Sequence, residues 1–365
     1  MDYQTIIPSP DAIALPAPYW LFKLLLVLTF VLHIVAMNIL VGGSFIAVVT
    51  KFRQNKNQYF DLLFKDITKK LPNFMAATIT LGIAPLLFLQ VIYGQYFYTS
   101  SVIIGWSWFS VLIILVLAYY GLYLVSFKNE RLADLTKWIL SLSLLFFFII
   151  GFIYSNNITL MLKPEYWAQK YFNDPTGHNL NLGEHSLIAR YLHFMVAAVS
   201  IGGLLVALIG VFKKGDDNYA GFLRNFGLKW FANGTMVQVV VGIIFLMMLP
   251  KLQMKLFMGG DVLATILFVV SIVITAYVIT AAIKGSRSGD NSKAIYISSV
   301  FTFVLILLMA IMRDILRDSY LSGYFNSSQF TISTQWEVLP LFLVLFIAGL
   351  ALWYKMLKRY FQTSN

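Results

Sequence analysis

The sequence predicts an all-α, polytopic membrane protein with nine transmembrane helices, arranged as two four-helix repeats plus one C-terminal helix. Three observations predict this fold. The chain is 59% hydrophobic and only 12% charged, with a mean hydropathy of +0.77. It contains nine apolar stretches long enough to span a bilayer core, for which about 20 residues suffice. Two parts of the chain also match each other at a constant offset of 160 residues.

Each apolar stretch is expected to form one helix, because backbone polar groups in lipid must be satisfied within the segment. The expected spans are 19–49, 74–97, 102–127, 132–155, 186–212, 228–249, 261–283, 293–316 and 338–357.

The basic residues predict the orientation. The connections after the first, third, fifth and seventh spans and the C-terminal tail, counted with the adjoining ends of the spans, hold 19 of the 27 Lys and Arg residues. By the positive-inside rule, we expect the N terminus outside and the C terminus inside a bacterial cytoplasmic membrane. The net charge of +11 is therefore mostly a topology signal, and no soluble basic domain is present that would indicate a nucleic-acid partner.

Cysteine is absent from the chain. A covalently attached c-type haem requires a CxxCH motif, and iron–sulfur clusters with thiolate ligands require cysteine as well. The sequence therefore excludes these redox groups, together with disulfides.

An internal duplication is indicated by ungapped matches over about 60 residues. Polar and glycine matches are the informative ones, since apolar residues match easily by chance. Four helices per half is an even number, so the two halves are expected to share one orientation, related by an axis along the membrane normal. The matched pairs are Leu32/Leu192, His33/His193, Gly42/Gly202, Gly43/Gly203, Lys69/Lys229, Asn73/Asn233 and Gly82/Gly242.

This duplication divides the chain into four parts. We expect a first repeat over 1–155, an outer loop over 156–185, a second repeat over 186–316, and an outer loop with the ninth helix over 317–365. The two outer loops are the natural surface for a partner protein on the outer face.

Two of the four histidines, His33 and His193, lie inside apolar spans. An imidazole in hydrocarbon is costly unless something binds it. Both fall in the outer half of helices that run inward, at equivalent repeat positions, which indicates haem iron ligands. The Gly-Gly pair that follows nine residues after each histidine either gives a planar macrocycle room or serves helix packing alone.

This pattern resembles subunit I of cytochrome bd quinol oxidase. The resemblance rests on a His-x8-Gly motif in the first span, repeated in the fifth, on nine helices arranged four plus four plus one, and on the predicted topology. It implies that His33 corresponds to the ligand of a high-spin haem b and His193 to the ligand of a low-spin haem b. The cofactors implied are one or two b haems and a quinone.

The sequence departs from that family at the oxygen site. The third span, WSWFSVLIILVLAYYGLYL, contains no acid, and AIMRDILRDSYL replaces the family's GRQPW signature. The seventh span lacks the family's methionine ligand, and the quinol-binding loop is shortened to PKLQMKLFMGGD. Since protons usually reach a buried oxygen site along carboxylates, we do not expect this chain to reduce oxygen by itself.

Further candidate ligands come from the end of the eighth span. Haem iron accepts His with His, His with Met, or His alone. Met312 stands beside the family's glutamate position and is the candidate sixth ligand near His33, with core packing as the alternative. Arg190, Arg313 and Arg317 lie at the outer boundary, where they either bind haem propionates or form helix-end salt bridges with Asp314 and Asp318.

Three functions remain open from the sequence. The first is a b-type cytochrome subunit that transfers electrons between a membrane quinol and a redox partner at the outer face, such as a cytochrome c or another subunit of a hetero-oligomeric complex. The second is a haem-free structural or assembly subunit of a respiratory complex. The third is a transporter, although transporters usually carry broken helices or polar groups at the midplane.

Overall fold

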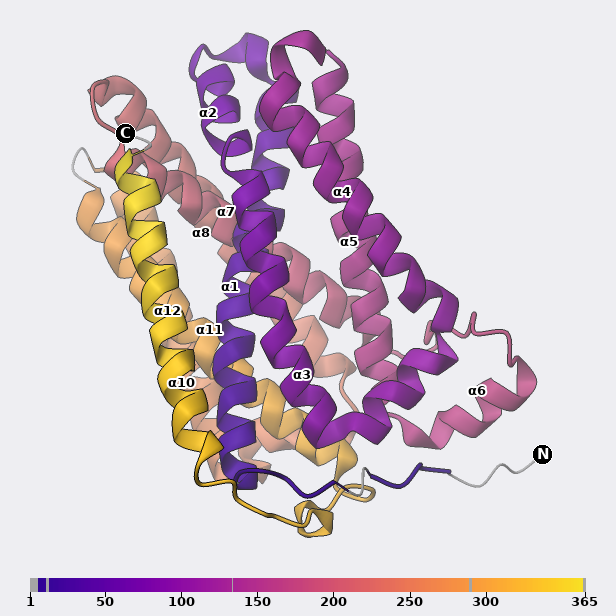
Figure 1. The fold of residues 1–365 in the computed structure, drawn as a ribbon. Coiled ribbons are helices and arrows are strands. Elements are labelled where there is room, and N and C mark those ends of the chain that lie inside the picture. Colours follow the sequence, from indigo (N-terminus) through magenta and orange to yellow (C-terminus); the bar gives the residue numbers. More distant parts are fainter. Residues whose placement is uncertain (1–5, 11–12, 133, 289–290, 364–365) are drawn as a thin grey trace.

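A computed structural model describes residues 6–10, 13–132, 134–288 and 291–363 of the chain. Within this part of the chain, nine helices are long and apolar enough to cross a membrane, as the sequence predicts. No β-sheet forms among the described residues; the one β-bridge joins Leu15 to Ile332. The fold is therefore an all-α helical bundle (Figure 1). The helices that carry the nine spans are α1 (Tyr19–Phe52), α3 (Leu71–Ile103), α4 (Gly105–Leu132), α5 (Leu135–Met161), α7 (Leu187–Phe212), α8 (Asp217–Met248), α10 (Val262–Gly285), α11 (Ser292–Leu321) and α12 (Val338–Thr363).

Several helices extend beyond the apolar spans. The helix α8 begins at Asp217, eleven residues before the expected span 228–249. Asp216 caps this start, because its carboxylate oxygen accepts a hydrogen bond from the Tyr219 amide at 2.9 Å. Hydropathy therefore located the lipid-facing part of the helix but not its polar continuation.

Short helices occupy connections that the sequence analysis left without structure. The helix α2 (Tyr59–Thr68) precedes α3, and α6 (Trp167–Asn173) lies in the segment 156–185. Between α8 and α10, α9 (Lys251–Lys255) continues into the π-helical turn η3 (Leu256–Gly260). Two single-turn 3-10 helices, η1 (Gln54–Lys56) and η2 (Pro164–Tyr166), precede α2 and α6, and η4 (Ser327–Gln329) precedes α12.

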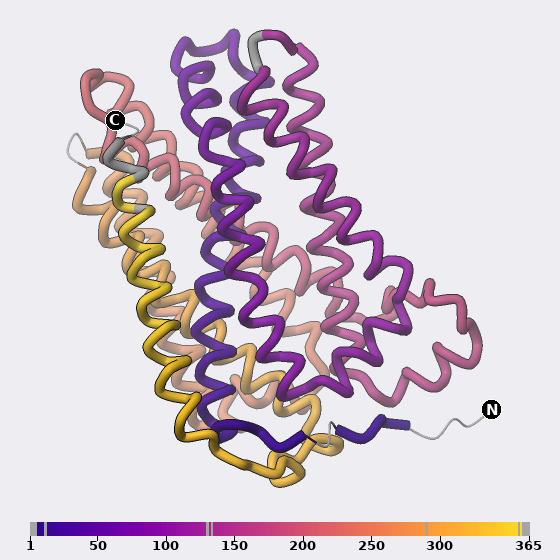
Figure 2. The backbone as a smooth tube through the Cα atoms, viewed as in Figure 1, coloured from indigo at the N-terminus to yellow at the C-terminus, as the bar shows by residue number. Residues whose placement is uncertain are grey.

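The centre of the bundle is formed by α1 and α7. Half of the most apolar stretch of α1 and 61% of that of α7 are buried inside the protein, whereas none of the corresponding stretch of α12 is buried. The backbone trace shows α12 standing at the edge of the bundle (Figure 2). The two histidines of interest are thus on the two central helices.

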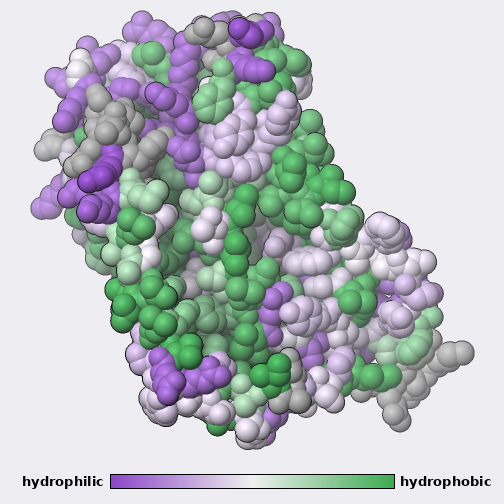
Figure 3. Space-filling model, in the orientation of Figure 1, coloured by the Kyte–Doolittle hydropathy of each residue, from purple (hydrophilic) through white to green (hydrophobic). Residues whose placement is uncertain are grey.

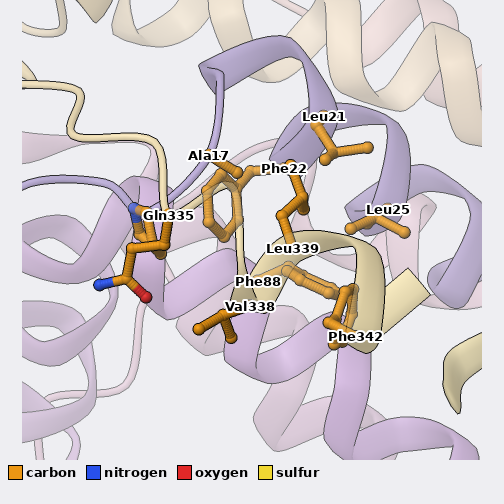
Figure 4. A pocket seen from close by; sticks show the side chains of 10 residues that line it. Ala17, Leu21, Phe22, Leu25, Phe88, Gln335, Val338, Leu339 and Phe342 are labelled. Carbon is orange, nitrogen blue, oxygen red and sulfur yellow. The ribbon is translucent and has the colours of Figure 1, made fainter. Parts of the chain in front are cut away.

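The two ends of the bundle differ in what they carry. The N-terminal segment, α6 and the segment 322–337 lie at one end, and α2 with the end of α12 lies at the other (Figure 1). We call the first of these the N-terminal end. A hydrophobic band separates hydrophilic residues that gather at the two ends (Figure 3). This distribution fits an integral membrane protein.

Candidate functional site

His193 is held between a glutamine and a methionine. Its Nδ1 lies 3.0 Å from Nε2 of Gln238 on α8, and its Nε2 lies 3.3 Å from Sδ of Met309 on α11. Gly242 packs against the ring, and a Cβ placed there would come within 3.3 Å of Cε1. A side chain at position 242 would therefore press on the imidazole.

The His193 side chain lines a cavity of about 550 Å³ between α7, α8, α10 and α11. This volume is in the range of small-molecule and cofactor sites. The wall is mostly apolar, and its charged and sulfur-containing members are few. Besides His193 they are Arg190, Met309, Met312 and Arg313.

His33 has a related but different environment. Its Nδ1 lies 3.0 Å from the backbone oxygen of Thr78 on α3. A carbonyl oxygen only accepts hydrogen bonds, so Nδ1 carries the proton and Nε2 keeps its lone pair. A Cβ on Gly82 would lie 2.9 Å from the ring. His33 is not among the residues that line the cavity of His193.

The contacts of the two histidines are equivalent in sequence. Each Nδ1 meets the residue 45 positions later, Thr78 or Gln238. Each ring packs on the glycine 49 positions later, Gly82 or Gly242. The two sets of contacts are thus offset by the same 160 residues as the sequence matches.

Two of the three candidate arginines face the cavity. Arg190 and Arg313 both line it. The Cζ atom of Arg190 lies 5.0 Å from the centre of the Phe245 ring, and that of Arg313 lies 4.4 Å from the centre of the Phe30 ring. Neither forms an ion pair with any described carboxylate, and Nε of Arg190 is buried without a hydrogen-bond partner. A buried donor without a hydrogen-bond partner is costly, so an anionic group in the cavity would stabilise the Arg190 guanidinium, and it would also attract that of Arg313.

Arg317 has a different role. Its guanidinium donates to Asp314 at 2.8 Å, and Asp314 also pairs with Lys23 at 2.6 Å. Asp318 pairs with Lys23 at 2.9 Å and accepts from the Tyr93 hydroxyl at 2.7 Å. Of the two helix-end salt bridges considered from the sequence, Arg317 with Asp314 is therefore present, whereas Asp318 bonds to Lys23.

The methionine that contacts His193 is not the one that the sequence indicated. It is Met309, one turn before Met312 on α11, and Met312 lines the same cavity. The sequence did not indicate Met309 or Gln238 as site residues. The available signal for Met309 was its spacing of four residues from Arg313, which places both on one helix face.

Groups of three or more His, Asp or Glu side chains that could hold a metal ion are absent from the described residues. Haem iron differs from such sites because the macrocycle supplies most of its ligands, so one or two protein side chains suffice. The imidazole and thioether at His193 are thus donors of the kind that a haem iron can take.

The comparison with solved structures identifies the fold. No family model matches the chain, and no curated protein matches its sequence. Among solved structures, a chain of the bd oxidase from Geobacillus thermodenitrificans superposes with a TM-score of 0.71. The match covers 95% of this chain and 100% of that chain, at 13% sequence identity.

The fold and the nine spans define a polytopic α-helical membrane protein. Its fold is that of a bd oxidase chain, and an identity of 13% makes this a likeness of fold alone.

Proposed function

We propose that this protein is a b-type cytochrome subunit that transfers electrons between a membrane quinol and a redox partner at the outer face. The observation that carries the proposal is the His193 cavity. An imidazole and a thioether from different helices meet inside it, and two arginines that form no ion pair with a described carboxylate share its wall. The bd oxidase fold supports membership of a respiratory membrane complex.

The residues present fit a haem b in this cavity. His193 and Met309 would hold the iron, a pair of side chains that haem iron accepts. Arg190 and Arg313 would bind the propionates, for which guanidinium groups are well suited. When bound, the haem supplies one-electron redox chemistry. The chain itself orients the imidazole through Gln238, gives the ring room through Gly242 and surrounds the site with apolar side chains.

Ligation requires a small adjustment of Met309. Its Sδ is in direct contact with Nε2 of His193 at 3.3 Å, whereas bonds from a transition metal to nitrogen and sulfur are each about 2 Å long. The two atoms must therefore separate. Methionine, which has an unbranched and flexible side chain, can make this movement at low cost.

His33 is the second candidate ligand in the proposal. Its Nδ1–H contact with the Thr78 carbonyl is the arrangement that metal-bound histidines usually make with their other ring nitrogen. We place one haem at His193 first, because His193 lines the cavity of about 550 Å³ and His33 does not.

A haem-free structural subunit is the alternative that one observation favours. The contact between Nε2 of His193 and Sδ of Met309 gives the imidazole a partner without any cofactor. In that case the two halves of the chain would serve to assemble a larger complex.

A reduced-minus-oxidised visible spectrum of the purified protein separates these functions. Haem is quantified as the pyridine haemochrome in wild type, His193→Ala and His33→Ala. We expect haem b bands in the wild type and their loss in His193→Ala. Wild-type protein produced with ample haem that contains none would overturn the cytochrome proposal in favour of the structural subunit.

A further inference from the structure

The side-chain amide of Gln238 lies beside His193 and makes only one of its possible contacts. Its Nε2 is 3.0 Å from Nδ1 of His193, and its buried Oε1 has no hydrogen-bond partner among the residues that the structure describes. We propose that Gln238 is a positioning residue that selects the tautomer of His193 and thereby sets both haem binding and the reduction potential of the iron. This inference rests on the proposed haem site.

Two orientations of the amide correspond to two tautomers. If the amide NH₂ donates to Nδ1, the imidazole proton must be on Nε2, where it points at the Met309 sulfur. The nitrogen that faces the cavity then has no lone pair for a metal. If the amide is rotated by half a turn, Oε1 accepts the proton of Nδ1, and Nε2 becomes available as a ligand.

Nothing holds the amide in the first orientation. Its Oε1 makes no hydrogen bond that rotation would break, and the two ends of an amide have nearly the same shape. Either orientation is therefore open to the amide. A haem iron would need an unprotonated Nε2, and the orientation in which Oε1 accepts from Nδ1 is the one by which Gln238 holds His193 in that tautomer.

The equivalent position in the first half of the chain lacks this choice. There the Nδ1 of His33 faces the backbone oxygen of Thr78, which can only accept. The tautomer of His33 is thus fixed, whereas that of His193 depends on a side chain. We therefore expect a side-chain substitution at position 238 to change haem binding or the reduction potential, and one at position 78 to change neither.

A hydrogen bond from Nδ1–H to an acceptor makes the imidazole a stronger electron donor to the metal. It therefore favours the ferric state over the ferrous state. Removing the acceptor should raise the ferrous fraction at a fixed ambient potential, and a stronger acceptor should lower it.

The test compares Gln238→Leu, Gln238→Met and Gln238→Glu with Thr78→Val, which changes a side chain but keeps the backbone oxygen at His33. The readouts are haem per polypeptide and the potential from a spectroelectrochemical titration. In Gln238→Leu we expect the ferrous-to-ferric ratio to rise about tenfold, or about 59 mV for one electron. Gln238→Glu keeps an acceptor and should titrate at or below the wild-type potential, and Thr78→Val should match wild type.

The same role for Gln238 is supported if Gln238→Leu loses haem while Gln238→Glu keeps it. Gel filtration must show that both variants are folded. Gln238→Met decides if Gln238→Leu does not fold. Wild-type haem content and potential in both apolar variants would overturn the role of Gln238 while leaving the haem site standing. If the wild type contains no haem that is lost in His193→Ala, the proposed function itself is overturned.

Discussion

Gly42 of α1 and Gly202 of α7 touch through their backbones where the two central helices cross. A Cβ on Gly42 would lie 2.8 Å from the Gly202 nitrogen, and one on Gly202 would lie 2.8 Å from the Gly42 Cα. The two glycines are equivalent positions of the predicted duplication. In the predicted duplication, a residue can touch its own equivalent only near the axis that relates the halves, so the prediction places that axis at this crossing.

Replacement of either glycine should therefore weaken the bundle. We expect Gly42→Ala and Gly202→Ala each to cost about 1–3 kcal/mol, the usual range for overpacking, and to lower the melting temperature of the detergent-solubilised protein. Gly221→Ala on α8 is the matched control, because nothing lies within 4 Å of a Cβ there. Equal melting temperatures for Gly42→Ala and Gly221→Ala would show that the crossing tolerates a methyl group.

Hydropathy predicted the nine spans because lipid solvation acts on each stretch separately. It could not predict the length of α8, whose first turns are polar, or the short helices α2 and α6. It also left two roles open for Gly42 and Gly202. The structure shows that they bring the helix backbones together.

The candidate site was predictable only in part. His193 stood out because a lone imidazole in an apolar span is unusual. Gln238 did not, because its meaning depends on a contact with a residue 45 positions away. Met309 is one of 13 methionines, most of which the sequence could not distinguish from core residues. Arg317 pairs with a carboxylate, whereas Arg190 and Arg313 line the cavity. This difference arises from how the helices pack, so the sequence did not reveal it.

The topology stays a prediction that labelling can test, because the chain contains no cysteine. Gly323 and Lys214 lie in exposed connections at opposite ends of the bundle. In intact spheroplasts, we expect a membrane-impermeant maleimide to label Gly323→Cys but not Lys214→Cys, and to label both after lysis. The reverse pattern would mean that the N-terminal end faces the cytoplasm, contrary to the positive-inside rule.

The ion-pair network around Lys23 should be important for stability. Lys23 contacts both Asp314 and Asp318, and its side chain is 16% exposed. Lys23→Met would leave two carboxylates short of a partner, and breaking buried pairs costs about 3–5 kcal/mol; partial exposure reduces that figure. We expect a clear fall in melting temperature. Lys65→Met, which breaks the exposed pair with Asp61, should change stability by less than about 1 kcal/mol. Similar effects of the two variants would contradict a structural role for the network.

The arginines should separate into two classes. Arg190→Leu and Arg313→Leu remove guanidinium groups that line the cavity, so we expect both to lower haem occupancy in the purified protein. Arg317→Leu breaks the pair with Asp314 instead. It should reduce thermal stability while leaving haem per folded polypeptide close to wild type. Haem loss in Arg317→Leu equal to that in Arg313→Leu would argue against propionate binding by the cavity arginines alone.

The contact between Nε2 of His193 and Sδ of Met309 predicts that substitutions of Met309 and Met312 have different effects on the haem spectrum. Met309→Leu removes the thioether in contact with the imidazole, whereas Met312→Leu removes one that only lines the cavity. With Met309 as an axial ligand, Met309→Leu should convert the haem from six-coordinate low-spin to five-coordinate high-spin, visible in the absorption and EPR spectra. Met312→Leu, a swap of similar volume that usually costs less than about 1.5 kcal/mol, should keep the low-spin spectrum. If Met312→Leu alone gave the high-spin signal, the sixth ligand would be Met312, and α11 would have to turn relative to His193 when the haem binds.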